Sequence, residues 1–328
     1  MVRIWGEVPL VLKTISPEEG LEFPQSSVDL IYESIIADLQ FAAENLPESY
    51  SGSDVGRATK GAAKSILGKV YLTLGDFQNA ESTLAEVLGL GYSLLSDYKS
   101  VFDHFNEHHS EYIFDIEYEA DLGGEGSNFV YRFIPNDKEL RDYFGITGDS
   151  GETLNPTDDY FSLFSDNDLR KDFAAVRGFV QDDGSFFTTK IPFTMKYLTS
   201  TNSQNDSRVN WKVTRFADVL LMYAEALNEN GKTNEALVEL NKIRTRANVE
   251  TYSGLSQAEA REAIELERRL ELGFEGHRWF DLVRTSKAYE VMNSKGYNLE
   301  PHHVLFPKPQ QQLDVVNDPS ILSQNNGY

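Results

Sequence analysis

The sequence predicts a mainly α-helical protein: a tetratricopeptide-like helical-repeat scaffold with a long irregular loop region and a few short strands. Two observations lead to this fold class. Residues 57–90 and 213–248 each carry two apolar stripes at helical spacing on either side of a glycine. Between these stretches, residues 119–212 are rich in Gly, Asn, Asp and aromatic residues and keep no sustained period.

Composition limits the classes of function. The 328 residues are 40% apolar, which suits one large domain or two ordinary ones. The formal charge of −22 repels phosphate backbones, so nucleic acid is not an expected partner. The absence of cysteine excludes disulfides, thiolate chemistry and Cys-ligated zinc.

The first helices follow from start and stop signals. Ser16 followed by Pro17 predicts a short capped helical turn. A longer helix begins after Ser26 or Ser27, because Val28 opens a series of apolar residues at helical spacing, and Pro47 ends it.

Two helical pairs share one register, offset by 156 positions. The first pair turns at Gly75 and the second at Gly231, where a glycine allows a tight connection. Small residues at matching places on the first helices let the second helices approach. The matched positions are Gly68 with Ala224, Tyr71 with Leu227, Ala80 with Ala236, Leu84 with Leu240, and Val87 with Ile243.

The remaining elements are shorter. The alternation in "EYIFDIEYEAD", residues 111–121, predicts a strand. Thr157 is expected to cap a helix that contains Tyr160. Ser256 with Glu259 forms a capping-box pattern that opens another helix.

A dense charged stretch, "ERRLELGFEGHRWFDLVR" at residues 267–284, allows two interpretations. His277 and Asp281 would share a helix face and could bind a metal, but Glu275 would point elsewhere as a third ligand. Alternatively, arginines pair with carboxylates in a structural junction while apolar side chains pack inward. We favour the structural network, which comprises Arg268, Arg269 and Arg278 with Glu271, Glu275 and Asp281.

Other chemical signals are weak. The adjacent His108 and His109 would point in different directions, and the acidic turns at 166–168 and 182–183 do not match an EF-hand. No phosphate-binding glycine motif or nucleophile elbow is present. The sequence therefore predicts no metal, no cofactor and no catalytic residue.

The aromatic loop region is the remaining candidate site. A Tyr or Trp ring can stack on the C–H face of a sugar while Asn, Asp and Arg bind its hydroxyls. These rings could equally be a local core beneath the loop. The candidate ligand-binding residues are Phe129, Tyr131, Arg132, Asn136, Tyr143, Phe144 and Trp211.

Four motifs in order resemble the SusD/RagB family of nutrient-binding outer-membrane lipoproteins from Bacteroidetes. They are "GRATKGAAKSILGKVYLTLGD", "RFADVLLMYAEALNENG", "ERRLELGFEGHRWFDLVR" and "HHVLFPKPQQQLDVVNDPSILSQNNGY". The run from Glu275 to Asp281 is the most specific of them. The resemblance extends from about Val2 to Tyr328.

The resemblance implies a single SusD-like domain over residues 1–328 that lacks its N-terminal part. It would consist of a helical hairpin at about 57–90, variable ligand-binding loops at about 119–212, and a second hairpin with a C-terminal signature at about 213–328. Relatives begin with a lipoprotein signal and an acylated cysteine, whereas "MVRIWGEVPLV" resembles a point inside the family pattern.

The implied role is non-catalytic capture of a glycan, starch-like or another polysaccharide, or of another nutrient, at the surface of the outer membrane. The ligand would pass to a SusC-like TonB-dependent transporter. Two alternatives remain open: a repeat scaffold that binds only protein, and a glycoside hydrolase, whose carboxylate pair cannot be assigned from sequence.

Overall fold

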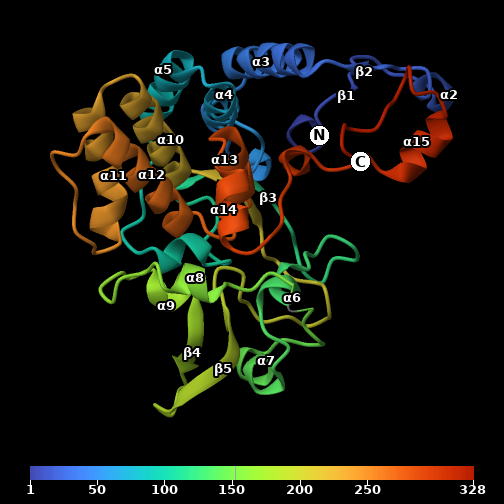
Figure 1. The fold of residues 1–328 in the computed structure, drawn as a ribbon. Coiled ribbons are helices and arrows are strands. Elements are labelled where there is room, and N and C mark those ends of the chain that lie inside the picture. The colour runs from blue at the N-terminus through green and yellow to red at the C-terminus, as the bar shows by residue number, and fades with distance from the viewer. Residues whose placement is uncertain (152) are drawn as a thin grey trace. The chain divides into compact units, whose positions relative to one another are not determined.

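A computed structural model describes residues 1–151 and 153–328 and is mainly helical (Figure 1). The chain divides into two compact units, one formed by residues 1–42 with 277–328 and the other by residues 43–276. The boundaries of these two units differ from the boundaries of the segments expected from the sequence. The single domain expected over residues 1–328 stays a prediction.

The terminal unit is built from short elements around one longer helix. Its segments line an apolar groove of about 800 Å³ that includes Trp5, Phe23 and Ile31. Its helices are α1 (Val2–Trp5), α2 (Pro17–Gly20), most of α3 (Val28–Asn45), α13 (Arg278–Arg284), α14 (Ala288–Ser294), η3 (Pro301–Val304) and α15 (Gln310–Val316), and its strands are β1 (Val8–Pro9) and β2 (Gln25–Ser26).

The larger unit, residues 43–276, holds the helical pairs and the loop region. Its helices are η1 (Gly52–Asp54), α4 (Lys60–Leu74), α5 (Phe77–Leu88), η2 (Lys99–Phe102), α6 (Phe129–Phe133), α7 (Lys138–Phe144), α8 (Asp158–Phe161), α9 (Lys171–Ala174), α10 (Phe216–Glu229), α11 (Thr233–Arg246) and α12 (Gln257–Glu271). Its strands are β3 (Tyr112–Ile116), β4 (Val176–Val180), β5 (Phe186–Phe193) and β6 (Trp211–Arg215).

The two helical pairs confirm the repeat register. Gly75 and Gly231 both take left-handed φ angles, 73° and 78°, which few residues other than glycine adopt at low cost. A Cβ on Gly68 would lie 2.5 Å from Leu84 Cδ2, so glycine is needed for α5 to approach α4. Leu84 and Leu240, the matched residues on the second helices, are both fully buried.

The caps predicted at the starts of two helices are also confirmed. The Ser16 hydroxyl accepts from the Glu19 N–H at 3.1 Å, while the Glu19 carboxylate accepts from the Ser16 N–H at 2.7 Å. Ser256 and Glu259 form the same reciprocal pair at the start of α12. Helix α3 begins at Val28 and ends at Asn45, two residues before Pro47, as its pattern predicts.

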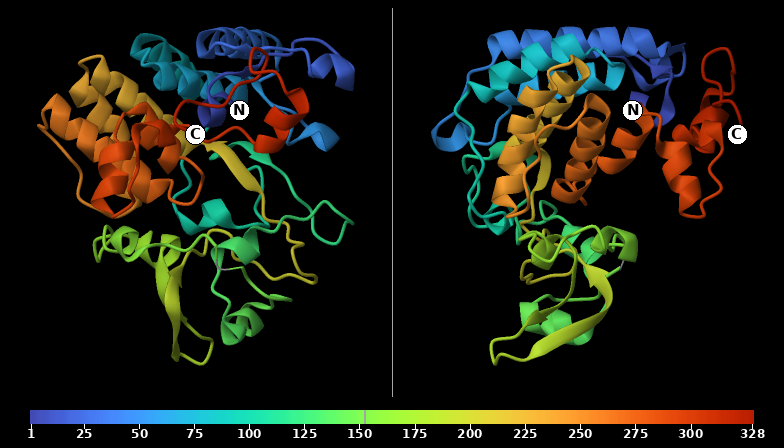
Figure 2. Two further views of the ribbon diagram at one scale, coloured as in Figure 1. Left: turned by 45° about the vertical axis from the view of Figure 1, so that its right-hand side comes forward. Right: turned by 60° about the vertical axis from the view of Figure 1, so that its left-hand side comes forward.

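The middle of the chain is less irregular than its sequence indicates. Helices α6 and α7 and the hairpin β4–β5 lie within residues 119–212, and both views of Figure 2 show this hairpin extending away from the helical pairs. Helices of five and seven residues are too short to show a period, which explains why the sequence pattern missed them. Asp137, which caps α7, and Gly145, which ends it, are signals that could have predicted this helix.

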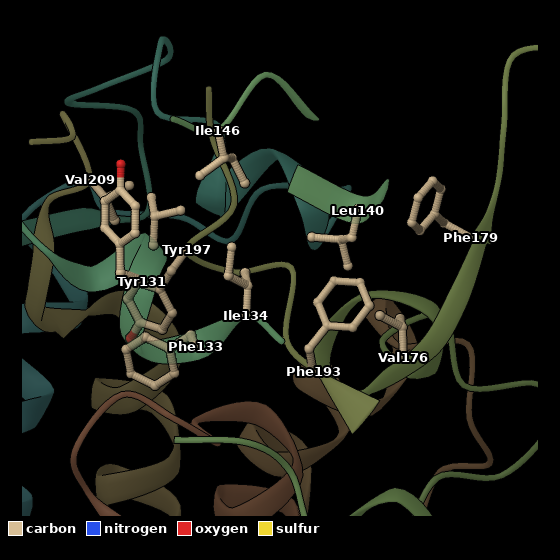
Figure 3. Packing of buried hydrophobic residues seen from close by; sticks show 11 residues of the cluster. Tyr131, Phe133, Ile134, Leu140, Ile146, Val176, Phe179, Phe193, Tyr197 and Val209 are labelled. Carbon is tan, nitrogen blue, oxygen red and sulfur yellow. The ribbon is translucent and has the colours of Figure 1, made fainter. Parts of the chain in front are cut away.

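This region has its own apolar core (Figure 3). Its members come from α6, α7, β4, β5 and the loops that follow α6, α7 and β5. The buried residues are Val130, Tyr131, Phe133, Ile134, Leu140, Ile146, Val176, Phe179, Phe193, Tyr197 and Val209. Burial of so much aromatic surface holds the long loops in a defined arrangement.

Candidate functional site

The candidate site begins where β3 and β6 end. These strands pair antiparallel, with Ile116 opposite Trp211, so the loop that leaves β3 and the loop that enters β6 run side by side. The Tyr118 N–H donates to Asn210 Oδ1 at 2.7 Å, and Ser127 pairs with Ser207 further along. Residues more than 90 positions apart in sequence therefore meet at one place.

Three partly exposed rings gather at this strand end: Tyr118, Phe129 and Trp211, which we call the aromatic platform. Phe129 lies 5.5 Å from Tyr118 and 5.2 Å from Trp211, measured between ring centroids. Beneath them, the buried Tyr197 stacks on Trp211 at 6.0 Å and an interplanar angle of 13°. The platform is therefore supported from below by ring contacts that continue into the core.

Polar groups border the aromatic platform. Arg208 donates to the Glu119 carboxylate at 3.1 Å, and its guanidinium lies 4.8 Å from the ring centroid of Phe105. Phe105 is 72% exposed. Asn210 donates to Glu107 at 2.7 Å. We call Phe105, Glu119 and Arg208 the rim, because the charged groups of Glu119 and Arg208 and the exposed ring of Phe105 contact one another in series.

Two of the residues predicted from sequence, Phe129 and Trp211, meet in the platform. Tyr131 does not join them, because it is only 2% exposed (Figure 3). Its hydroxyl lies 2.8 Å from the Thr147 carbonyl, 2.7 Å from Thr201 Oγ1 and 2.8 Å from the Ser203 carbonyl. Burial raises the pKa of Tyr131. The ring of Tyr131 therefore packs in the core, and its hydroxyl contacts the surrounding loops. Neither face of the ring is accessible to a ligand.

Tyr143 and Phe144 form a second aromatic group on α7. Their rings are 5.0 Å apart, and both pack on Phe179 of β4, at 4.8 and 4.7 Å. The Tyr143 hydroxyl donates to Asp182 at 3.0 Å. Tyr143 remains partly exposed and can still contact a ligand.

The two polar residues predicted near these rings are both exposed. Arg132 lies in the last turn of α6, and the Asn136 side-chain carbonyl accepts from Arg141. Asn136 therefore helps to hold α7, and the exposure of Arg132 leaves it accessible to solvent.

Sequence reasoning missed Tyr118, Phe105 and Arg208. Tyr118 continues the alternation of β3 on the same side as Phe114 and Ile116, which are less buried than Ile113 and Asp115, so its outward position could have been predicted. Phe105 and Arg208 lie in loops without a period, and only the fold brings them together.

The stretch at residues 267–284 contributes a buried charge network. Arg215, at the end of β6, donates to Glu111 at 2.8 Å, to Glu271 at 2.7 Å and to Glu275 at 2.7 and 2.9 Å. Glu111 directly precedes β3. The network therefore holds the ends of both strands that carry the aromatic platform.

The charges in this network balance. The side chain of Arg170, fully buried, donates to Asp168, Glu267 and Glu271. The Lys196 ammonium donates to Glu275 at 2.7 Å. Arg246 binds Glu111 and Glu271, and Arg244 binds Glu267. The linked set comprises five carboxylates, Glu111, Asp168, Glu267, Glu271 and Glu275, and five cations, Arg170, Lys196, Arg215, Arg244 and Arg246.

The arginines that bind Glu271 differ from the predicted ones. The arginines that bind Glu271 come from positions 170, 215 and 246, far from the stretch itself. Arg268 binds Asp218, Arg269 binds Asp159, and Arg284 binds Asp281. A sequence motif shows that charges must pair but not which distant segment supplies the counter-ion.

Burial and charge act in opposite directions on these pKa values. Burial alone would raise the pKa of Glu271, but the guanidiniums of Arg246, Arg215 and Arg170 hold it well below its usual value. Burial, together with the charge of Arg215, lowers the pKa of Lys196 to about 8, although Glu275 opposes the shift. Glu271 therefore remains ionised and structurally paired.

The comparisons with known proteins agree with this architecture. A family model described as "SusD family" matches residues 180–328, and one described as "Starch-binding associating with outer membrane" matches residues 1–72. A SusD-like protein of Formosa agariphila is 31% identical over 379 aligned positions, which cover 100% of this chain and 70% of that protein.

The chain belongs to the SusD-like family.

Solved structures show the same fold. A laminarin-binding SusD-like protein superposes with a TM-score of 0.81 at 29% identity, covering 100% of this chain and 75% of that one. A SusD superfamily protein from Parabacteroides distasonis gives a TM-score of 0.85 at 25% identity, again over 100% and 75%. The mainly helical, tetratricopeptide-like fold predicted from sequence is thereby confirmed.

Within residues 1–151 and 153–328, no helix combines the length and the apolar character that crossing a membrane requires.

Proposed function

We propose that this SusD-like protein binds a glycan without chemically changing it, and that the aromatic platform stacks on the sugar rings. The observation that carries the proposal is the aromatic platform itself: three partly exposed rings bordered by the rim. A pyranose offers an apolar C–H face to a ring and hydroxyls to Arg208, Glu119 and Asn210. The platform supplies surfaces for binding, and the carboxylate of Glu119, which follows Tyr118, is engaged by Arg208.

The relatives support this ligand class. One structural relative is named as laminarin-binding, and the family model that matches residues 1–72 is described as starch-binding and associated with the outer membrane. We further propose that the protein acts at the surface of the outer membrane and delivers the glycan to a SusC-like TonB-dependent transporter. That role follows from the family resemblance.

Isothermal titration calorimetry with laminarin, extended to a polysaccharide panel, tests the proposal. Trp211→Ala and Tyr118→Ala remove rings of the aromatic platform, and each lost stacking contact is expected to cost about 0.5–1.5 kcal/mol, or roughly 2- to 13-fold in affinity. Phe186→Ala, which removes a 63% exposed ring at the tip of the β4–β5 hairpin, is the matched control and should bind normally.

Tryptophan fluorescence gives a second readout. The chain has three tryptophans, Trp5, Trp211 and Trp279. In a Trp5→Phe/Trp279→Phe variant, Trp211 alone reports, and a stacked sugar should shift its emission. No heat or emission change with any polysaccharide would reject glycan binding and favour the protein-only scaffold, whereas release of reducing sugar would favour a hydrolase.

Tyr143 provides a separate test of the sequence-predicted site. Its partial exposure leaves the ring accessible to a ligand, and weaker glycan retention by a folded Tyr143→Ala variant on an affinity gel would extend the site to α7. Tyr131→Ala would instead remove a buried ring and its hydroxyl contacts, so any loss of retention would report misplaced loops.

A further inference from the structure

A separate open pocket of about 280 Å³ lies in the unit formed by residues 43–276. Three segments form it: the connection between α3 and α4, the turn after α5, and the loop that leads into β3. Tyr112 opens β3, whereas the aromatic platform begins beyond Ile116 at the other end of this strand. The two strand ends are about 13 Å apart at 3.3 Å per residue.

Three tyrosines line this pocket, Tyr50, Tyr92 and Tyr112, which is why we call it the tyrosine pocket. All three are partly exposed. Groups that can donate or accept hydrogen bonds, including Glu48 and Ser110, also line the pocket. Apolar ring faces beside hydroxyl-binding groups match the two-faced chemistry of a sugar ring.

The walls of the tyrosine pocket are held in place before any ligand binds. A Cβ on Gly61 would lie 2.2 Å from the Tyr92 hydroxyl oxygen, so α4 admits Tyr92 only because residue 61 is glycine. The ring of His108 meets that of Tyr112 edge-on at 4.9 Å, and its Nε2 lies 3.4 Å from Glu117. Preformed walls reduce the ordering cost of binding.

A second glycine, Gly56, lines the tyrosine pocket. Gly56 has a φ of 98°, and a Cβ there would lie 2.6 Å from the Glu117 carboxylate. Both its backbone conformation and this close approach require glycine. Glu117 therefore packs against Gly56 of the pocket wall and directly precedes Tyr118 in the sequence.

The charges around the pocket disfavour an anionic ligand. Arg57 is the guanidinium among the lining residues, and it already binds Asp54 at 3.0 Å. Glu48 lines the pocket and Glu117 lies at its wall, within a chain of formal charge −22. A phosphate or carboxylate would meet net negative charge here, whereas a neutral polyol would not.

We propose that the tyrosine pocket is a second carbohydrate site, which holds one neutral sugar ring independently of the aromatic platform. Its volume lies just below the roughly 300–1,000 Å³ typical of pockets for drug-sized ligands, which suits one ring better than a longer glycan segment. The proposal rests on the proposed function only in taking a carbohydrate as the ligand, because its residues are all distinct from those of the platform.

Saturation-transfer difference NMR on the full chain tests the proposal with the methyl glycosides of glucose, galactose, mannose and xylose as probes. Tyr50→Ala removes one aromatic wall, and Ser49→Trp puts a bulky ring at an exposed lining position so that it occupies space in the pocket. Tyr289→Ala, at a 52% exposed tyrosine outside the pocket, is the matched control. Circular dichroism confirms that each variant is folded.

We expect at least one methyl glycoside to give a signal that falls at least fivefold in both pocket variants. The signal should be unchanged in Tyr289→Ala and keep at least half its intensity in Trp211→Ala. No signal with any glycoside, or a signal that persists in Ser49→Trp and Tyr50→Ala, would overturn the proposal. If the wild type shows no laminarin binding but keeps the glycoside signal, the proposed glycan binding by the aromatic platform is overturned, and the proposal for the tyrosine pocket stands.

Discussion

Removing the Arg215 guanidinium tests the structural role of the buried charge network. In Arg215→Met the side chain keeps comparable length but loses five donated hydrogen bonds, to Glu111, Glu271 and Glu275 and to the Glu271 carbonyl. Removing one partner of a buried ion pair typically costs about 3–5 kcal/mol, because the other charge stays buried.

The structure places the expected cost at the lower end of this range. Each carboxylate keeps another cation: Glu271 keeps Arg170 and Arg246, Glu275 keeps Lys196, and Glu111 keeps Arg246. We therefore expect a loss of about 3 kcal/mol in the free energy of unfolding. With a denaturant slope of about 3 kcal/mol per molar, the urea midpoint falls by about 1 M.

Equilibrium urea unfolding at pH 7, followed by circular dichroism at 222 nm, measures this loss. Arg208→Met is the matched control, because the Arg208–Glu119 pair is largely exposed, with side-chain exposures of 36% and 51%, and should contribute below about 1 kcal/mol. A loss in Arg215→Met that is no larger than in Arg208→Met would show that the network does not brace the fold.

Three further outcomes follow from the structure. Because the guanidiniums hold the pKa of Glu271 below its ordinary value of 4.5, its stabilisation is complete above that pH and is lost as pH falls below it, so acid unfolding should begin there in urea titrations. The buried Lys196, with a pKa of about 8 against 10.5 in the unfolded chain, acts in the same direction at higher pH: the unfolded chain binds more protons between these pH values, so stability should rise with pH there by up to about 3 kcal/mol. That rise should be missing in Lys196→Met, and equal slopes would refute it. Gly68→Val drives a side chain into Leu84 and should cost about 1–3 kcal/mol in thermal unfolding, whereas Gly89→Ala, whose Cβ meets its nearest neighbour at 3.4 Å, should change little; similar melting temperatures would contradict the packing argument.

The helical scaffold could be predicted because its signals are local. Gly75 and Gly231, the matched apolar positions around them, and the Ser256–Glu259 cap each depend on residues within a few turns of one another. Helical periodicity over a dozen or more residues leaves few alternatives. The short helices α6 and α7 could not be predicted from periodicity, because a helix of one or two turns is too short to show a period.

The candidate site depended on contacts that no local pattern contains. The sequence by itself placed an aromatic-rich, polar segment between two helical pairs, and the proposed aromatic platform takes Phe129 and Trp211 from that segment. Tyr131 and Phe129 are two residues apart, yet one ring lies in the core and the other at the surface. Only the pairing of β3 with β6 decided this, because it brings Tyr118 and Trp211 together across more than 90 residues.

The charged stretch shows the same division. Its composition determined that Glu271 and Glu275 must be paired, since buried carboxylates are costly without counter-ions. Tertiary structure decided which cations pair with them, by bringing Arg170, Lys196 and Arg215 from three distant segments. The physical reason is that helix formation depends on neighbours along the chain, whereas burial and charge pairing depend on neighbours in space.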